Sequence, residues 1–175
     1  MITSNNNNDV YAIVGAKYHS TSVSAYLLSY EKTTNQWEHG AEFIPGGASA
    51  NGRFDGTSIS ASYDQFGWDA TISEEWVAIS APYDTASTRK VLLFWLNSVT
   101  NGGQLEPDTT LIASDKQYLT CFGMSVAMEG DTLVVGAAND RDNVGSVYVF
   151  RYNANGSGEW TQAAKLTPDD VSSGS

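Results

Sequence analysis

Residues 139–145, with the sequence Asn-Asp-Arg-Asp-Asn-Val-Gly, contain the residue types best suited to binding a metal ion. Carboxylate and amide oxygens are the ligands that calcium prefers, and a glycine lets the chain turn around the ion. Asp140, Asp142 and Gly145 follow the pattern Asp-x-Asp-x-x-Gly. The pattern predicts a calcium loop, and the alternative is a solvated acidic turn between two strands. The predicted ligands are Asn139, Asp140, Asp142 and Asn143.

Catalytic chemistry has much weaker support. His19 and His39 are the two histidines, and neither adjoins a serine or cysteine motif that would pair a nucleophile with a base. Glu74 and Glu75 are adjacent carboxylates in an expected turn, where such side chains are normally solvated. Cys121 is the single cysteine and is expected to fill space in the core. We therefore expect a protein that is not an enzyme and requires no cofactor.

Two further features are candidates for contact with other molecules. Trp37 and Trp160 each begin a strand that we expect at the outer rim of the fold. An exposed indole there would bind a partner or a sugar, and the alternative is packing in the core. Asn155 opens the sequence Asn-Gly-Ser, which is a glycosylation sequon in a secreted eukaryotic protein. We therefore expect contact residues at Trp37 and Trp160 and a glycan at Asn155.

The composition excludes several classes of function. Nine Lys and Arg residues against 20 Asp and Glu give a net charge of −11 and a pI near 4.3. A nucleic-acid-binding surface needs a basic patch, and anionic lipid repels an acidic protein. No apolar run approaches the roughly 18 residues of a membrane span. We therefore expect neither nucleic-acid binding nor insertion into a membrane.

The elements that must position these residues recur along the chain. The pair Phe66-Gly67 is repeated 56 residues later as Phe122-Gly123. The same spacing relates residues 76–82 to 132–138 and residues 91–94 to 147–150. A third, more diverged copy lies upstream and includes residues 10–16 and 24–28. Recurrence at one spacing is typical of repeat architectures in which neighbouring units bury a common core.

Each copy has the pattern of four short strands. Segments rich in β-branched and aromatic residues alternate with turn residues, and no segment has helical periodicity over ten or more residues. The last copy predicts strands at residues 122–128, 132–137, 146–152 and 160–166. The fold class is therefore all-β, built from four-stranded antiparallel units, and units of this kind are typical of β-propeller blades.

The last copy resembles the FG-GAP repeat of integrin-alpha-like β-propellers. The resemblance rests on residues 121–138, 145–150 and 160–166, which include Phe-Gly and Val-Gly-Ala. It implies a diverged, incomplete repeat at residues 1–64, a second repeat at 65–120 and a third at 121–175. It also implies an extracellular or cell-surface location. The predicted calcium loop lies where some of these repeats bind calcium, although Val144 and Tyr148 replace oxygen ligands of the integrin-like loop.

Three copies are fewer than the four to eight blades of a propeller. Residues 3–9 are polar, so we expect eleven strands and a first repeat without its innermost strand. Because an unpaired sheet edge accepts further strands, we expect adhesion or structural self-assembly into a filament or array. The partners would be other copies of the chain, sharing strands, or other cell-surface proteins. The alternatives are a fragment of a larger integrin-like or lectin-like ligand-binding propeller, calcium-dependent in one form, and a compact arrangement that is not a propeller.

Overall fold

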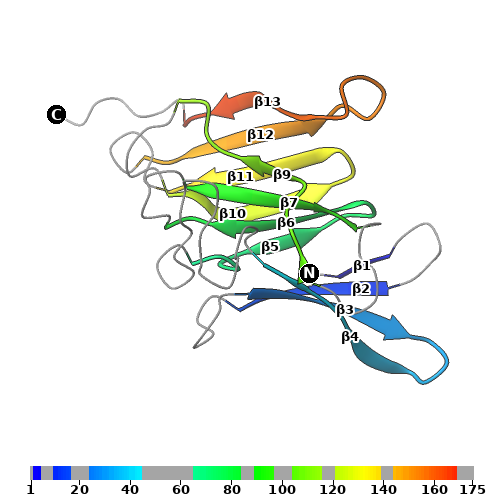
Figure 1. Cartoon of the computed structure of the whole chain (residues 1–175). Helices are drawn as coiled ribbons and strands as arrows, with labels where there is room; N and C mark the ends of the chain where they lie inside the picture. Colours follow the sequence, from blue (N-terminus) through cyan, green and yellow to red (C-terminus); the bar gives the residue numbers. More distant parts are fainter. Residues whose placement is uncertain are drawn as a thin grey trace.

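The computed structural model describes residues 2–4, 10–16, 24–44, 65–83, 89–96, 104–115, 121–138 and 144–168. Within these ranges the regular structure consists of β-strands, and there is no α-helix. The strands form three sheets that follow one another in chain order (Figure 1). The prediction of an all-β fold made of four-stranded antiparallel units is therefore confirmed.

The second and third sheets each contain four antiparallel strands in chain order. The second sheet consists of β5 (Ala70–Ile72), β6 (Trp76–Ala81), β7 (Lys90–Trp95) and β9 (Thr109–Leu111). The third consists of β10 (Phe122–Glu129), β11 (Thr132–Ala137), β12 (Ser146–Tyr152) and β13 (Trp160–Leu166). The strands of the third sheet agree closely with the predicted ranges, because alternating apolar residues and clear turn residues mark each of them.

The first sheet has five strands in the order β1-β2-β3-β4-β8. They are β1 (Ile2–Ser4), β2 (Val10–Ala16), β3 (Ser24–Glu31), β4 (Gln36–Phe43) and β8 (Gln104–Leu105). The last of these comes from the segment between β7 and β9, and it pairs in parallel with β4 through Glu42 and Gln104. A short strand from the second repeat thus extends the edge of the first sheet.

The expectation that the first repeat lacks its innermost strand, and the count of eleven strands, are wrong. Residues 2–4 form β1, which pairs antiparallel with β2 through Ile2–Ala12, Thr3–Tyr11 and Ser4–Val10. An edge strand is held by backbone hydrogen bonds, so it requires no run of apolar side chains. The polar composition of residues 3–9 therefore concealed a three-residue strand. This result removes the premise on which strand sharing between copies was expected.

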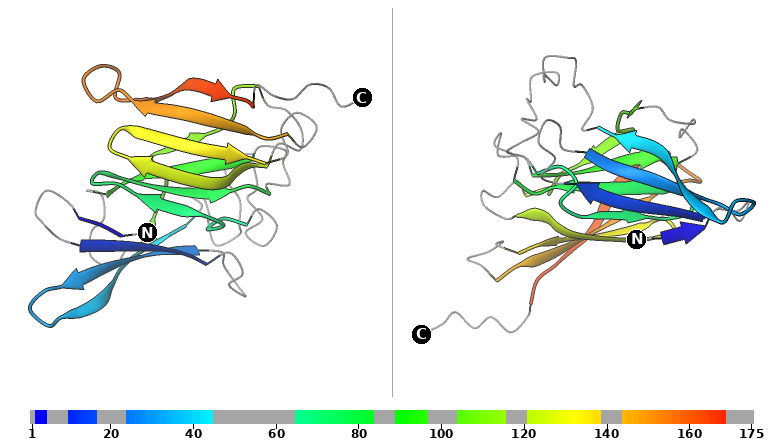
Figure 2. Two further views of the ribbon diagram at one scale, coloured as in Figure 1. Left: turned by 180° about the vertical axis from the view of Figure 1, so that it is seen from behind. Right: turned by 90° about the horizontal axis from the view of Figure 1, so that it is seen from below.

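The second sheet is buried on both faces, whereas the first and third are each buried on one. We call the face of a sheet that points toward the preceding sheet its proximal face, and the opposite face its distal face. For the first sheet, the proximal face is the one that points away from the second sheet. One cluster of buried apolar side chains lies between the first and second sheets, and another lies between the second and third. Figure 2 shows the second sheet, in green, between the other two. Within the described residues, no sheet covers the proximal face of the first sheet or the distal face of the third.

The repeated Phe-Gly pair has a structural cause. Gly67 and Gly123 have φ angles of 83° and 91°, in the left-handed region that favours glycine. A Cβ atom on Gly123 would lie 3.2 Å from the Cβ of Ser80 in the second sheet. Phe66 and Phe122, which precede these glycines, are buried in the two inter-sheet cores. The pair therefore anchors each new sheet in a core and allows its first strand to approach the preceding sheet closely.

Candidate functional site

The predicted calcium ligands Asn139, Asp140, Asp142 and Asn143 lie outside the described residues. The flanking strands are placed: β11 ends at Ala137, which pairs with Ser146 at the start of β12. The segment therefore connects two adjacent antiparallel strands. Among the residues that the structure describes, no group of three or more His, Cys, Asp or Glu could hold a metal ion. Calcium binding at residues 139–143 stays a prediction.

Of the two tryptophans expected to be exposed, Trp37 is 44% exposed and Trp160 only 9%. The expectation for Trp160 is therefore wrong. Its ring lies 5.8 Å from Trp76 of the second sheet and 5.6 Å from Tyr152, measured between ring centroids. Trp160 is buried because the second sheet covers the proximal face of the third sheet. Trp37 is the second residue of β4 in the first sheet, whose proximal face no described residue covers.

The other single-residue expectations have mixed outcomes. Asn155 lies in the exposed turn between β12 and β13, a position that a glycan can reach, and its glycosylation stays a prediction. Cys121 is buried, as expected for a residue that fills space in the core. Trp68 and Trp76 both contact the third sheet from the second repeat. Trp76 is part of the second core, and the indole N–H of Trp68 donates to the carbonyl oxygen of Met124 at 3.2 Å.

The uncovered distal face of the third sheet repeats a face that is buried elsewhere in the molecule. Its strands bring together Val134–Val149 and Val147–Leu166, and the corresponding pairs on the second sheet are Ala78–Leu93 and Val91–Leu111. The four residues on the second sheet belong to the core against the third sheet. A pocket of about 510 Å³, lined by Gly136, Val147 and Leu166 among others, lies on the uncovered face. The same positions are therefore covered in one repeat and open in the next.

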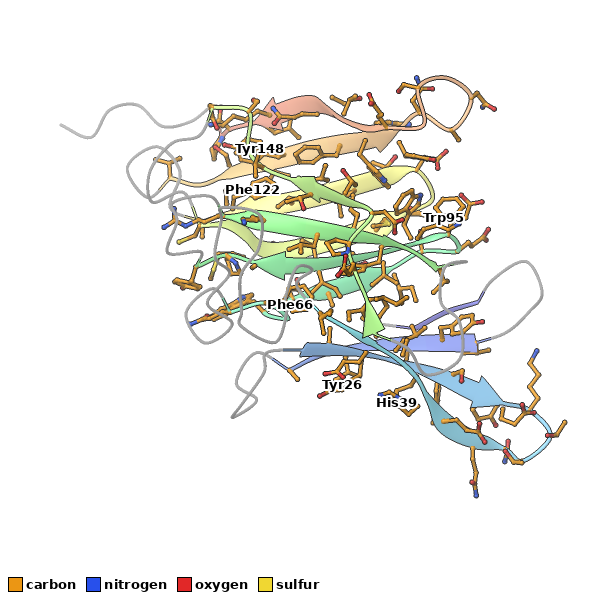
Figure 3. All side chains as sticks on the ribbon, viewed as in Figure 1. Tyr26, His39, Phe66, Trp95, Phe122 and Tyr148 are labelled. Carbon is orange, nitrogen blue, oxygen red and sulfur yellow. The ribbon has the colours of Figure 1, made fainter. Side chains whose placement is uncertain are left out.

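Exposed apolar side chains gather on the two uncovered faces. Six large apolar side chains of the described residues are exposed, by 36% to 56%: Val14, Trp37, Tyr83, Val134, Val147 and Leu166. All of them except Tyr83 lie on the proximal face of the first sheet or the distal face of the third. In Figure 3, Tyr26 and His39 lie on the side of the first sheet away from the second, with ring centroids 5.8 Å apart. Concentrated apolar exposure of this kind marks an interaction surface.

An aromatic cluster joins the second and third sheets at the end marked by Trp95 in Figure 3. Trp76 packs edge-on against Trp95 at 4.7 Å and against Tyr152 at 5.1 Å, and Trp95 lies 6.3 Å from Tyr152. On the first sheet, Tyr30 and Trp37 form a tilted pair at 5.3 Å, at the hairpin that corresponds to the one where Tyr152 and Trp160 pair on the third sheet. The pair on the first sheet has no sheet against it in the described part of the chain.

Polar side chains of the second sheet bind the first strand of the third. The backbone N–H of Val126 donates to Oδ2 of Asp69 at 2.8 Å, and that of Met128 donates to Oγ1 of Thr71 at 3.2 Å. The other carboxylate oxygen of Asp69 accepts from the N–H of Ala70 at 2.9 Å. These bonds satisfy backbone donors that would otherwise be unpaired at a buried strand edge.

A second polar contact connects the opposite edges of the same two sheets. Asp115, which follows β9, accepts a hydrogen bond from the hydroxyl of Tyr148 at 3.1 Å and forms an ion pair with Lys165. Tyr148 is completely buried in the core between the sheets. The carboxylate therefore satisfies the polar end of a core side chain and holds the last strand of the third sheet.

A pocket of about 540 Å³ lies beside the aromatic cluster and is lined by four rings, those of Trp76, Trp95, Tyr152 and Trp160. Asp108 and Glu159, both exposed, also line it, and Oδ2 of Asp108 accepts from the backbone N–H of Trp95 at 2.6 Å. The indole N–H groups of Trp76 and Trp160 are buried without an acceptor among the described residues. The pocket thus combines aromatic surface with carboxylate acceptors.

The turn between β3 and β4, close to Trp37, holds a carboxylate with an altered pKa. The backbone N–H of Thr33 donates to Oε1 of Glu31 at 2.8 Å, and the hydroxyl of Thr33 donates to the same oxygen at 2.7 Å. These two bonds, the backbone bond most, together with the charge of Lys32, hold the pKa of Glu31 below its ordinary value. Glu31 is therefore ionised at neutral pH, and it follows Tyr30 directly in the chain.

Residues 107–150 match the family model of the FG-GAP repeat. The match runs from just before β9 into β12, so it includes the Phe-Gly segment that opens the third sheet. The chain therefore contains an FG-GAP repeat, as the resemblance predicted. No curated protein matches the chain. Among the described residues, no helix is long and apolar enough to span a membrane.

Sequence reasoning did not identify Trp95, Asp69 or Arg151 as residues of interest. The spacing of 56 residues contained the necessary signal, because Arg151 occupies in the third repeat the place that Trp95 has in the second. The replacement of an aromatic residue by a charged one at an equivalent position indicates that the surroundings of the two sheets differ.

Proposed function

We propose that the chain is a non-catalytic, extracellular or cell-surface repeat protein that acts in adhesion or structural self-assembly. The observation that supports this most strongly is the open distal face of the third sheet. Val134, Val147 and Leu166 are exposed there, although the matching residues of the second sheet are buried by a neighbouring sheet. Removing such surface from water is favourable by about 25 cal/mol per Å² of apolar area. The FG-GAP repeat supports the extracellular location, which is typical of such repeats.

The proposed mode of association is packing between sheet faces. We no longer expect copies of the chain to share strands, because β1 occupies the edge position that was expected to be empty. The proposed partners are other copies of the chain or other cell-surface proteins, with no role for nucleic acid and no insertion into the membrane. Association requires no cofactor in this proposal. Calcium binding at residues 139–143 is tested separately by calorimetric titration of the chain and of an Asp140→Asn, Asp142→Asn variant.

The test is the molar mass of the purified chain in solution, measured by light scattering from about 1 µM to about 100 µM, a range that detects moderate affinities. We expect species heavier than the 18.8 kDa chain, at a fraction that rises with concentration. Electron microscopy with and without a calcium chelator then distinguishes a filament from a closed particle. A chain that stays folded and monomeric at about 100 µM would contradict self-assembly.

A second candidate function is binding of carbohydrate, as in a lectin-like propeller, and the pocket beside the aromatic cluster supports it. Sugar hydroxyl groups donate hydrogen bonds to carboxylates such as Asp108 and Glu159, and the apolar faces of sugar rings pack on aromatic rings such as those that line the pocket. The test is calorimetric or NMR titration with galactose, mannose and N-acetylglucosamine oligosaccharides. We expect Trp95→Ala to abolish binding and Tyr83→Ala, a change at an exposed ring outside the pocket, to leave it unchanged. Equal binding by both variants would exclude the pocket.

A further inference from the structure

We propose that the distal face of the third sheet binds the proximal face of the first sheet of a second copy of this chain, with Arg151 stacked on Tyr30 and Trp37 of that copy. The inference rests on the proposed self-assembly and specifies which two surfaces meet. Its template is the junction between the second and third sheets within one chain, where a distal face packs on a proximal face.

The proximal face of the first sheet has the same layout as the proximal face that is buried in this template. In the third sheet, Tyr152 and Trp160 are a register pair at the hairpin between the last two strands. In the first sheet, Tyr30 and Trp37 are a register pair at the corresponding hairpin. Farther along the same strands, Tyr26 and Leu28 take the places of Tyr148 and Phe150. The first sheet therefore presents the side chains that a preceding distal face would cover.

The distal face of the third sheet supplies the matching surface. Val134, Val147 and Leu166 take the places of Ala78, Val91 and Leu111, which pack on the third sheet within one chain. These residues are small or branched and apolar, and the pocket beside them leaves room for larger side chains of a partner. An apolar face with a hollow thus meets a face with protruding aromatic rings.

Arg151 gives the junction its chemical specificity. It lies opposite Thr132 as Trp95 lies opposite Trp76, and Trp95 in turn is 6.3 Å from Tyr152. If the first sheet of a second copy packs on the third sheet in the way that the third sheet packs on the second, Arg151 lies next to Tyr30 of that copy. A planar guanidinium stacks favourably on the faces of tyrosine and tryptophan.

Two copies are required because the two faces are unlike and lie on opposite sides of the second sheet in one chain (Figure 2). Contact between unlike faces is heterologous, so it closes into a ring or continues as a filament. Two copies would contribute six sheets, a number within the range of closed propellers. Both outcomes use the same junction.

The experiment uses two variants that each disable one face. Val147→Asp places a charge on the distal face of the third sheet, and Val14→Asp places one on the proximal face of the first. Each residue is exposed in the single chain, so folding is retained, which circular dichroism and thermal unfolding verify. Tyr83→Asp is the matched control at the one exposed apolar side chain outside both faces, among those described. Trp37→Ala replaces Val14→Asp if that variant does not fold.

We expect each variant alone to associate at least about 100-fold more weakly than the unmodified chain, because a carboxylate would be desolvated without a partner. The control should associate normally. A mixture of the two variants should regain heterodimers, since one contributes an intact proximal face and the other an intact distal face. Arg151→Ala should weaken association about 5- to 30-fold, and Arg151→Lys should restore only part of it.

Two results would overturn the inference and separate it from the proposed function. If the unmodified chain assembles and neither face variant weakens it, self-assembly stands and this junction is wrong. If one variant still associates fully by itself, the contact joins two like faces, and the heterologous junction is also wrong. If the unmodified chain is monomeric throughout, both the junction and the proposed self-assembly fail.

Discussion

The second and third sheets contain the same four-stranded unit but differ in what surrounds them. In β6 of the second sheet, every residue from Trp76 to Ala81 is buried. In β11 of the third sheet, buried residues alternate with more exposed ones, and Val134 is 36% exposed. Apart from Trp76 and its equivalent Thr132, the two strands carry small or apolar side chains at equivalent positions, so the difference in burial there comes from the neighbouring sheet and not from the strand itself.

This comparison shows that the residue types on a sheet face differ according to whether a neighbouring sheet covers that face. Where a neighbour is present, the face carries large aromatic residues such as Trp76 and Trp95, which fill the junction. Where the described residues include no neighbouring sheet, the equivalent positions hold Thr132 and Arg151, whose polar groups are solvated by water. The distal face of the third sheet is therefore suited to both exposure and reversible contact.

The largest expected effect is a difference in stability between substitutions on the two faces of β11. Leu133 is fully buried against the second sheet, and Val134 is its neighbour on the open face. We expect Leu133→Ala to lower the free energy of unfolding by about 2–5 kcal/mol, because it leaves a cavity in the core. Val134→Ala should change it by about 0.5 kcal/mol or less. Urea denaturation in dilute solution measures both, and equal losses would mean that the distal face is covered within the chain.

The next effect concerns the polar attachment between sheets. Asp69→Ala removes the acceptor for the N–H of Val126, which should cost about 1–3 kcal/mol in stability, because a buried donor then lacks a partner. Ser125 is the equivalent residue 56 positions later on the open face, so Ser125→Ala is the matched control and should be close to neutral. Thermal and urea unfolding test the pair. A neutral Asp69→Ala would show that water replaces the carboxylate.

A smaller loss is expected at Asp115. Asp115→Ala removes the acceptor for the hydroxyl of Tyr148 and the partner of Lys165, and it should cost about 1 kcal/mol, since the ion pair is partly solvated. Asp115→Asn should lose less, because it still accepts the hydroxyl bond. Urea unfolding at low and high salt separates the two contributions. A loss that disappears entirely at high salt would assign it to the ion pair alone.

The smallest effect concerns pH. Because the pKa of Glu31 is lower in the folded chain, the contacts of its ionised form stabilise the fold above the unfolded pKa and are lost as pH falls through the folded value. NMR titration should give a pKa below that of the same side chain in urea. Thr33→Val should raise it only part of the way, since the backbone N–H remains. An unchanged pKa in the folded chain would contradict the bonding at this turn.

Much of the fold followed from local pattern, and the errors occurred where local pattern carries no information. The spacing of 56 residues and the alternation of apolar residues predicted the strands of the third sheet closely. Strands β1 and β8 were missed because short edge strands depend on backbone hydrogen bonds to distant segments, which composition does not reveal. The exposure of Trp160 was misjudged for a related reason, since its covering residue, Trp76, lies in another repeat.

The amino-acid sequence by itself determined the repeat, the all-β class and the acidic character of the chain. These properties depend on residue type and spacing within one unit, where a strand needs only alternation and turn residues. Only the tertiary structure decided which faces are covered, because Val91 and Val147 are the same residue at equivalent positions and yet one is buried and the other 37% exposed. Burial is a property of the neighbour as much as of the side chain, and contact between sheets joins residues far apart in the chain.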